Sequence, residues 1–155
     1  MSGLEVRIVN IEPLHVAAAL GFGASPEPEA WDKILAYAKA NNLPVEPADG
    51  ARYYGFNNPD PSPGSPNYGY EQWLVVDEAM KGTEEVEIKD FEGGLYAVAR
   101  CQDLATIGET WQKLVGWSED SPYHKSGHQW LENFLVSPDV PPEAYIFDLY
   151  LPISE

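Results

Sequence analysis

Alternation of apolar and polar side chains predicts most of the strands in this chain. Residues 128–136, HQWLENFLV, read as a strand in which Trp130, Glu132 and Phe134 share one face, since strand side chains alternate between the two faces of a sheet. An ionised carboxylate between two aromatic rings is costly unless something compensates its charge. Glu132 is therefore a candidate ligand contact. The alternative is a strand carboxylate that faces water.

Helical periodicity predicts two helices between such strands. The first begins at Pro26, after the N-cap residue Ser25, and ends near Asn42, and the second covers residues 107–117. Strands are expected within residues 4–19, with a break at Glu12-Pro13, and at 52–56, 70–76, 86–91, 96–101, 130–136 and 145–151. Residues 57–66, NNPDPSPGSP without a regular pattern, are expected to form a loop.

The same order of elements occurs twice, and part of the sequence repeats with it. Glu5-Val6-Arg7-Ile8 recurs 80 residues later as Glu85-Val86-Glu87-Ile88, and Trp31 falls on Trp111 at the same offset. Residues 70–75 then align with residues 131–136 at an offset of 61, which sets Glu71 against Glu132. We predict an α+β fold of tandem pseudo-symmetric β-α-β-β repeats, in which two helices pack on a mainly antiparallel sheet. The repeats cover about residues 4–78 and 84–153 of a single domain spanning 1–155.

Charge and composition narrow the classes of partner. Nine Lys and Arg against 25 Asp and Glu give a formal net charge of −16, which repels a phosphate backbone and argues against direct nucleic-acid binding. The same field favours cationic ligands. No apolar run reaches the roughly 18 residues of a membrane span, and the N-terminus lacks a secretory pattern. Cys101 is the only cysteine, is expected to be buried, and fits a cytoplasmic protein.

The sequence shows no other motif that indicates a catalytic, metal-binding or phosphate-binding site. His15, His124 and His128 have no metal-ligand spacing with a cysteine or carboxylate. The chain has neither a nucleophile elbow nor a phosphate-binding loop. We therefore expect no metal and no cofactor.

A co-linear series of motifs resembles the GyrI-like family, the effector-binding domain of multidrug-sensing AraC-type and MerR-type regulators, in a stand-alone form without a helix-turn-helix. The resemblance implies two halves whose helices flank a central groove that binds bulky aromatic cations, with a glutamate at the position of Glu132 meeting the positive charge. The motifs are Ser25-Pro26-Glu27, Ala30-Trp31, Gly55-Phe56-Asn57-Asn58-Pro59, Tyr68-Gly69-Tyr70-Glu71, Trp73, Phe91-Glu92-Gly93-Gly94, Tyr96-Ala97-Val98, Trp111, Leu114, Trp117, Leu131-Glu132 and Leu149-Tyr150-Leu151-Pro152.

Aromatic residues around two glutamates make up the predicted ligand site. Aromatic faces attract delocalised cations, and a carboxylate in a groove adds a charge term. For the tryptophans on the helices, packing in the core is the alternative. The predicted ligand-binding residues are Trp31, Tyr37, Tyr54, Phe56, Glu71, Trp73, Trp111, Trp130, Glu132, Phe134 and Tyr145.

Three functions are consistent with these sequence features. The first is a binding module for amphipathic aromatic, often cationic, compounds. The second, which stand-alone relatives suggest, is a hydrolase of strained cyclopropane-bearing electrophiles in which Glu132 or Glu71 acts as acid or base. The third is action on a protein partner, either gyrase or a separate regulator.

Overall fold

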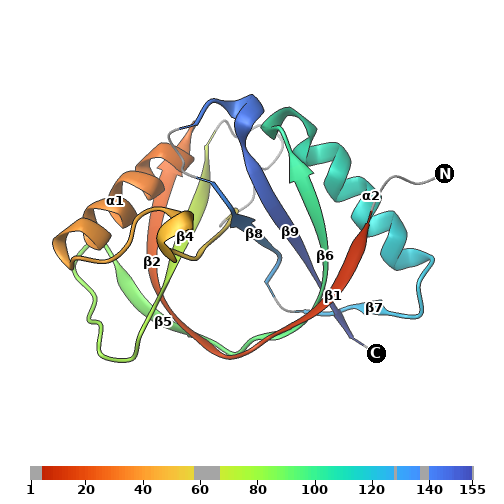
Figure 1. Cartoon of the computed structure of the whole chain (residues 1–155), viewed down its shortest axis with the longest axis horizontal. Helices are drawn as coiled ribbons and strands as arrows, with labels where there is room; N and C mark the ends of the chain where they lie inside the picture. Colours follow the sequence, from red (N-terminus) through yellow and green to blue (C-terminus); the bar gives the residue numbers. More distant parts are fainter. Residues whose placement is uncertain (1–4, 58–66, 128, 137–139, 155) are drawn as a thin grey trace. The chain divides into compact units, whose positions relative to one another are not determined.

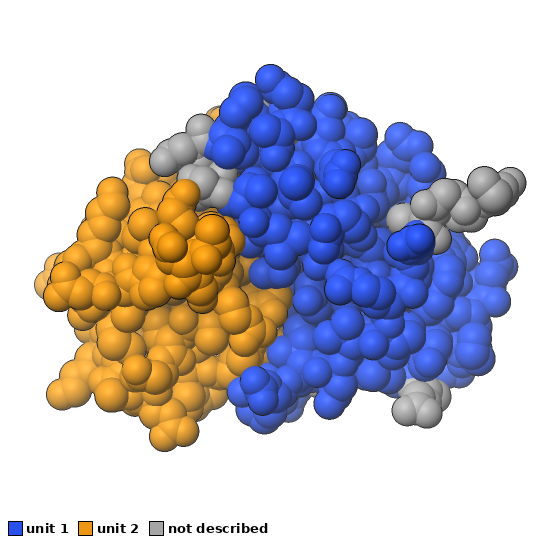
Figure 2. All heavy atoms as spheres, in the orientation of Figure 1, with its two compact units in different colours: residues 1–13, 92–155 blue, residues 14–91 orange. Residues whose placement is uncertain are grey.

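The chain forms two compact units in the computed structural model, which describes residues 5–57, 67–127, 129–136 and 140–154. Unit 1 comprises residues 1–13 and 92–155, and unit 2 comprises residues 14–91 (Figure 2). Within these described residues each unit contains one α-helix, at least one short 3-10 helix and an antiparallel sheet. The prediction of an α+β fold with two helices on a mainly antiparallel sheet is confirmed.

Unit 2 has the sheet order β3-β4-β2-β5, with α1 on one face (Figure 1). Helix α1 begins, as expected, at a proline after Ser25 and has two glutamates in its first turn, which suits the helix dipole. Gly21 lies against this helix, and a Cβ there would overlap the carbonyl oxygen of Pro26. The elements are β2 (Leu14–Gly23), α1 (Pro26–Ala40), η1 (Pro47–Asp49), β3 (Tyr53–Asn57), β4 (Tyr68–Val76) and β5 (Glu87–Phe91).

Unit 1 has the sheet order β1-β6-β9-β8, and β7 also pairs with the end of β9. The short helix that leads into α2 is capped by Asp103, whose side chain accepts the Ala105 N–H at 3.0 Å. The elements are β1 (Val6–Ile11), β6 (Gly94–Gln102), η2 (Leu104–Thr106), α2 (Ile107–Glu119), β7 (His124–Lys125), β8 (Leu131–Phe134), η3 (Pro142–Ala144) and β9 (Ile146–Ser154).

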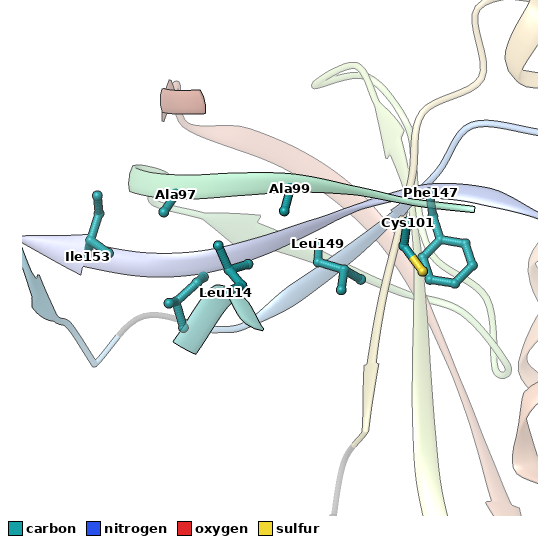
Figure 3. Close-up of a cluster of buried hydrophobic side chains, with 8 residues drawn as sticks. Ala97, Ala99, Cys101, Leu114, Phe147, Leu149 and Ile153 are labelled. Carbon is teal, nitrogen blue, oxygen red and sulfur yellow. The ribbon is translucent and has the colours of Figure 1, made fainter. Parts of the chain in front are cut away.

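The core of unit 1 lies between α2 and the strands β6 and β9 (Figure 3). Leu114 is its helix residue and has no exposed surface, while small alanines on β6 let the helix approach the sheet closely. Cys101 belongs to this cluster and is 1 % exposed, as predicted. The buried members are Ala97, Ala99, Cys101, Leu114, Phe147, Leu149, Leu151 and Ile153.

The first strand of each sequence repeat pairs outside its own repeat. Strand β1 pairs with β6 of the second repeat, and β5 pairs with β2 of the first. The chain therefore crosses over at Pro13 and again after Phe91, so the compact units do not follow the repeat boundaries. At the second crossing Gly93 has φ 80°, and a Cβ there would overlap the carbonyl of Ile11, so glycine is required.

The elements match the expected ranges with few exceptions. Strand β8 is shorter than residues 130–136, and the two-residue strand β7 was not expected. Each repeat has two strands before its helix, separated at Pro13 in the first repeat and at Gly93 in the second, which agrees with the expected strand ranges. His128 and residues 58–66 of the predicted loop lie outside the described residues, and Asn57 ends β3.

Replacing Leu114 with alanine tests the unit 1 core. Because this side chain is completely buried, we expect Leu114→Ala to lower the free energy of unfolding by about 2–5 kcal/mol in a denaturant titration. Leu104→Ala is the matched control, since Leu104 is 37 % exposed. Equal losses in the two variants would contradict this description of the core.

Tyr53 predicts a loss of stability at alkaline pH. Its hydroxyl donates to the carbonyl of Val45 at 2.7 Å, and burial, followed by the charge of Glu46, raises the pKa of Tyr53 from 10.0 to about 12. The folded state thus holds this proton more tightly than the unfolded state, so the stabilisation is complete below pH 10 and disappears as the pH rises toward 12. We expect Tyr53→Phe to flatten the decline in unfolding free energy between pH 10 and 12. An unchanged slope would refute the assignment.

Candidate functional site

Strand pairing places Glu132 on the face of the unit 1 sheet that α2 covers. In the β8–β9 register Glu132 lies opposite Leu149, and directly opposed residues point to the same face. Leu149 belongs to the core beneath α2. Glu132 therefore points toward the helix.

Two tryptophans join Glu132 on this face. Trp111, on α2, donates its indole N–H to Glu132 Oε2, with 3.3 Å between Nε1 and Oε2. The ring centroids of Trp111 and Trp130 are 5.3 Å apart, and the ring planes are tilted by 38°. Trp130 is 37 % exposed, while Glu132 and Trp111 are half-buried. We call Trp111, Trp130 and Glu132 the Glu132 cluster. It combines accessible aromatic surface with a carboxylate.

Further aromatic rings extend along the same strands. Phe134 shares the face of Glu132 by alternation, and its ring lies 5.7 Å from Phe147 and 6.5 Å from Tyr145. The structure thus brings five predicted site residues into one unit: Trp111, Trp130, Glu132, Phe134 and Tyr145.

Unit 2 has a counterpart of the tryptophan pair, but it is closed. When the two units are matched by strand register, Tyr53 corresponds to Trp130. Trp31 contacts Tyr53 edge to face, with ring centroids 4.8 Å apart, where Trp111 contacts Trp130 in unit 1. Trp31 is 8 % exposed and Tyr53 is fully buried. Trp31 therefore belongs to the core of its unit. Tyr37 does too, since it is 4 % exposed and its hydroxyl donates to the carbonyl of Lys81 at 2.7 Å.

The counterpart of Glu132 is Gly55, and the alignment of Glu132 with Glu71 is wrong. Gly55 lies opposite Gln72 on β4, as Glu132 lies opposite Leu149 on β9, an offset of 77 (132 less 55). The Tyr70 hydroxyl takes the space above Gly55, where a Cβ would overlap it. The sequence comparison matched β4 to β8, whereas the sheets match β4 to β9.

Glu71 lies on the opposite face of its sheet, away from α1. It is 3 % exposed and accepts from the Trp73 indole N–H at 2.6 Å and from Lys89 Nζ at 2.9 Å. The Trp73 ring also contacts Phe56 at 5.1 Å and Phe91 at 5.3 Å. Tyr54 shares this face, opposite Trp73, and its hydroxyl accepts from Arg52 at 2.9 Å. The predicted residues Tyr54, Phe56, Glu71 and Trp73 thus form a second, buried cluster in unit 2.

When the two units are matched by strand register, the counterpart of Glu71 in unit 1 is Asp148, which the sequence interpretation missed. Asp148 is 4 % exposed and accepts from Arg7 Nη2 at 2.7 Å and from Arg100 Nε at 2.6 Å. The pattern that could have revealed it is Asp148-x-Tyr150-Leu151, which repeats Glu71-x-Trp73-Leu74. Each unit therefore buries one carboxylate against cationic side chains on the face away from its helix.

The described residues offer neither a metal site nor a membrane-spanning helix. They contain no group of three or more His, Cys, Asp or Glu side chains placed to hold a metal ion. They also contain no helix that is both long and apolar enough to cross a membrane.

The described residues define an α+β protein in which Trp111 of helix α2 contacts a carboxylate, Glu132, and a second tryptophan, Trp130. Residues 7–153 match the Cass2 family of integron-associated effector binding proteins. The chain belongs to this family, which is a GyrI-like type of domain, and its class of function is small-molecule binding. No curated protein matches the sequence.

Solved structures share the fold at low sequence identity. The EcmrR C-terminal domain has a TM-score of 0.72 and 11 % identity, covering 99 % of each chain. A hydrolase from Listeria innocua has a TM-score of 0.69 and 14 % identity, covering 97 % of this chain and 92 % of the other. SAV2435 bound to tetraphenylphosphonium has a TM-score of 0.61 and 12 % identity, covering 97 % and 94 %. At these identities the likeness concerns the fold alone.

Proposed function

We propose that this protein binds amphipathic aromatic compounds, many of them cationic, at the Glu132 cluster. The observation that carries the proposal is the contact of Trp111 with both Glu132 and the partly exposed ring of Trp130. A delocalised cation placed there would meet aromatic surface and negative charge together.

The energetics suit ligands of varied shape. A good contact between a cation and an aromatic ring contributes about 0.5–2 kcal/mol, and stacking requires no unique hydrogen-bond geometry. The charge of the Glu132 carboxylate acts over a longer range, so it selects ligands by their charge and not by their shape. We therefore infer a multidrug type of recognition, in which charge and aromaticity matter more than exact shape.

A relative of the same fold supports the cationic class. SAV2435 has been solved with tetraphenylphosphonium, a bulky aromatic cation. Because identity to that protein is only 12 %, we transfer the ligand class as a proposal and base the residues on the geometry of unit 1.

The charge selectivity of Glu132 can be tested with two ions of nearly equal shape. We expect Glu132→Gln to weaken binding of tetraphenylphosphonium about 10- to 100-fold, which corresponds to about 1.4–2.7 kcal/mol, because the favourable charge is lost. Binding of tetraphenylborate, an anion of similar outline, should not weaken. Isothermal titration calorimetry measures both affinities.

Glu119→Gln is the control for net charge, since Glu119 is exposed on α2 of the same unit. It should leave tetraphenylphosphonium affinity within a factor of about two at 0.15 M salt, where exposed charges are screened. If Glu119→Gln and Glu132→Gln weaken the cation equally, the effect is one of overall charge and Glu132 is not the contact.

Hydrolysis is the second candidate function, favoured by the Listeria innocua hydrolase that shares the fold. In that case Glu132 would exchange a proton with water or with the leaving atom of a strained ring, beside the Trp111 indole. Glu71 lies in unit 2 and is bonded to Lys89, which makes it the weaker choice for this role.

Turnover separates this function from binding. If the protein is a hydrolase, a cyclopropane-bearing electrophile incubated with it should gain the mass of one water, and Glu132→Gln should slow this by about 10²–10⁴ while the compound still binds. Mass spectrometry follows the product and calorimetry the binding. Tight binding with unchanged compound after prolonged incubation would exclude hydrolysis of that substrate.

A further inference from the structure

Unit 2 contains an open cavity of about 530 Å³ beside β2, at the point where its neighbour β5 begins. Strand β5 pairs with β2 only over residues 14–18, whereas β4 follows β2 to Gly23. Beyond Ala18, no described strand pairs with this edge of β2. The cavity occupies this notch and is lined by residues 18–20, Glu71 and residues 82–89.

The described residues that line the cavity are strongly acidic and include no aromatic ring. They include four glutamates, at positions 71, 84, 85 and 87, and one cation, Lys89. Ala18, Leu20 and Val86 supply apolar surface between them, and the side chain of Leu20 is unusually exposed for a leucine at 44 %. This lining differs from the Glu132 cluster, whose main surface is indole.

A buried charge forms part of the wall. The Glu71 side chain is 4 % exposed, and Lys89 Nζ lies 2.9 Å from its Oε2. The Lys89 side chain is 36 % exposed, so its ammonium can move into water while Glu71 stays in place. An incoming ammonium group could then take over the position of Lys89 Nζ, leaving the buried carboxylate compensated throughout.

The remaining wall is a turn with a defined conformation. The Thr83 N–H donates to the Val86 carbonyl at 2.8 Å, and Thr83 Oγ1 accepts from the N–H groups of Glu85 and Val86, each at 3.2 Å. These bonds fix the backbone that carries the exposed carboxylates of Glu84 and Glu85. The cavity therefore presents its charges from an ordered turn rather than from a loose acidic segment.

We propose that this notch is a second ligand site, which takes an aliphatic polyamine of the spermidine type. Three ammonium groups separated by short methylene chains match a wall of four glutamates and one lysine, and the methylenes match Ala18, Leu20 and Val86. Aromatic cations gain little here because the lining offers no ring to stack on. The site is independent of the proposed function, since none of its lining residues belongs to the Glu132 cluster.

Calorimetric titration with spermidine at fixed ionic strength tests the proposal. We expect saturable binding to the intact protein that weakens at least 10-fold in the triple variant Glu84→Gln, Glu85→Gln, Glu87→Gln. These three side chains are exposed, so folding should be preserved, which thermal melting checks. Glu132→Gln should leave spermidine affinity unchanged, and the triple variant should leave tetraphenylphosphonium affinity unchanged.

The matched control removes three exposed glutamates from unit 1: Glu109→Gln, Glu119→Gln and Glu143→Gln. This variant has the same net charge as the test variant and should bind spermidine as the wild type does. Equal weakening in both triple variants would reduce the effect to overall charge and overturn the site. The absence of saturable spermidine binding, or equal heat from magnesium ions, would overturn it as well.

Discussion

The register of β9 between β6 and β8 is the constraint on which the Glu132 cluster depends. It places Leu149 and Glu132 toward α2 and Asp148 toward the opposite face. A slip of one residue would bury the Asp148 carboxylate beneath the helix and turn Leu149 outward. Asp148 opposes such a slip, because its two oxygens accept from Arg7 and Arg100. An ion pair on the far face thus fixes the side chains that meet at the site.

Charge also explains which edge strand joins which sheet. By register, Arg7 of β1 corresponds to Glu87 of β5, since they lie opposite the matched residues Val98 and Ala18. If β5 took the place of β1, Glu87 would face the buried Asp148, and like charges at that distance repel. If β1 took the place of β5, Val9 would replace Lys89 and leave Glu71 without that ammonium. The exchanged arrangement compensates both buried acids.

The sequence predicts the elements well but misjudges which strands correspond. Helical periodicity located both helices, and Pro13 located the first bend, because these signals depend on local backbone geometry. The match of Glu71 to Glu132 failed because local similarity of letters does not report which strand lies between two others. Strand pairing shows that Glu71 corresponds to Asp148, and the side-chain contacts show that Arg7, far away in the chain, compensates Asp148.

The two units differ in the residues that occupy matched positions on the sheet face beneath the helix. In unit 2 the tryptophan pair is buried, and glycine at position 55 makes room for the Tyr70 phenol, which fills the face beneath α1. In unit 1 the position that corresponds to Tyr70 is occupied by Phe147, and the position that corresponds to Gly55 is occupied by Glu132. The Glu132 carboxylate accepts a hydrogen bond from the indole N–H of Trp111, and Trp130 is partly exposed. Closing the pair favours packing, whereas the open pair in unit 1 leaves the aromatic surface on which the proposed ligand site depends.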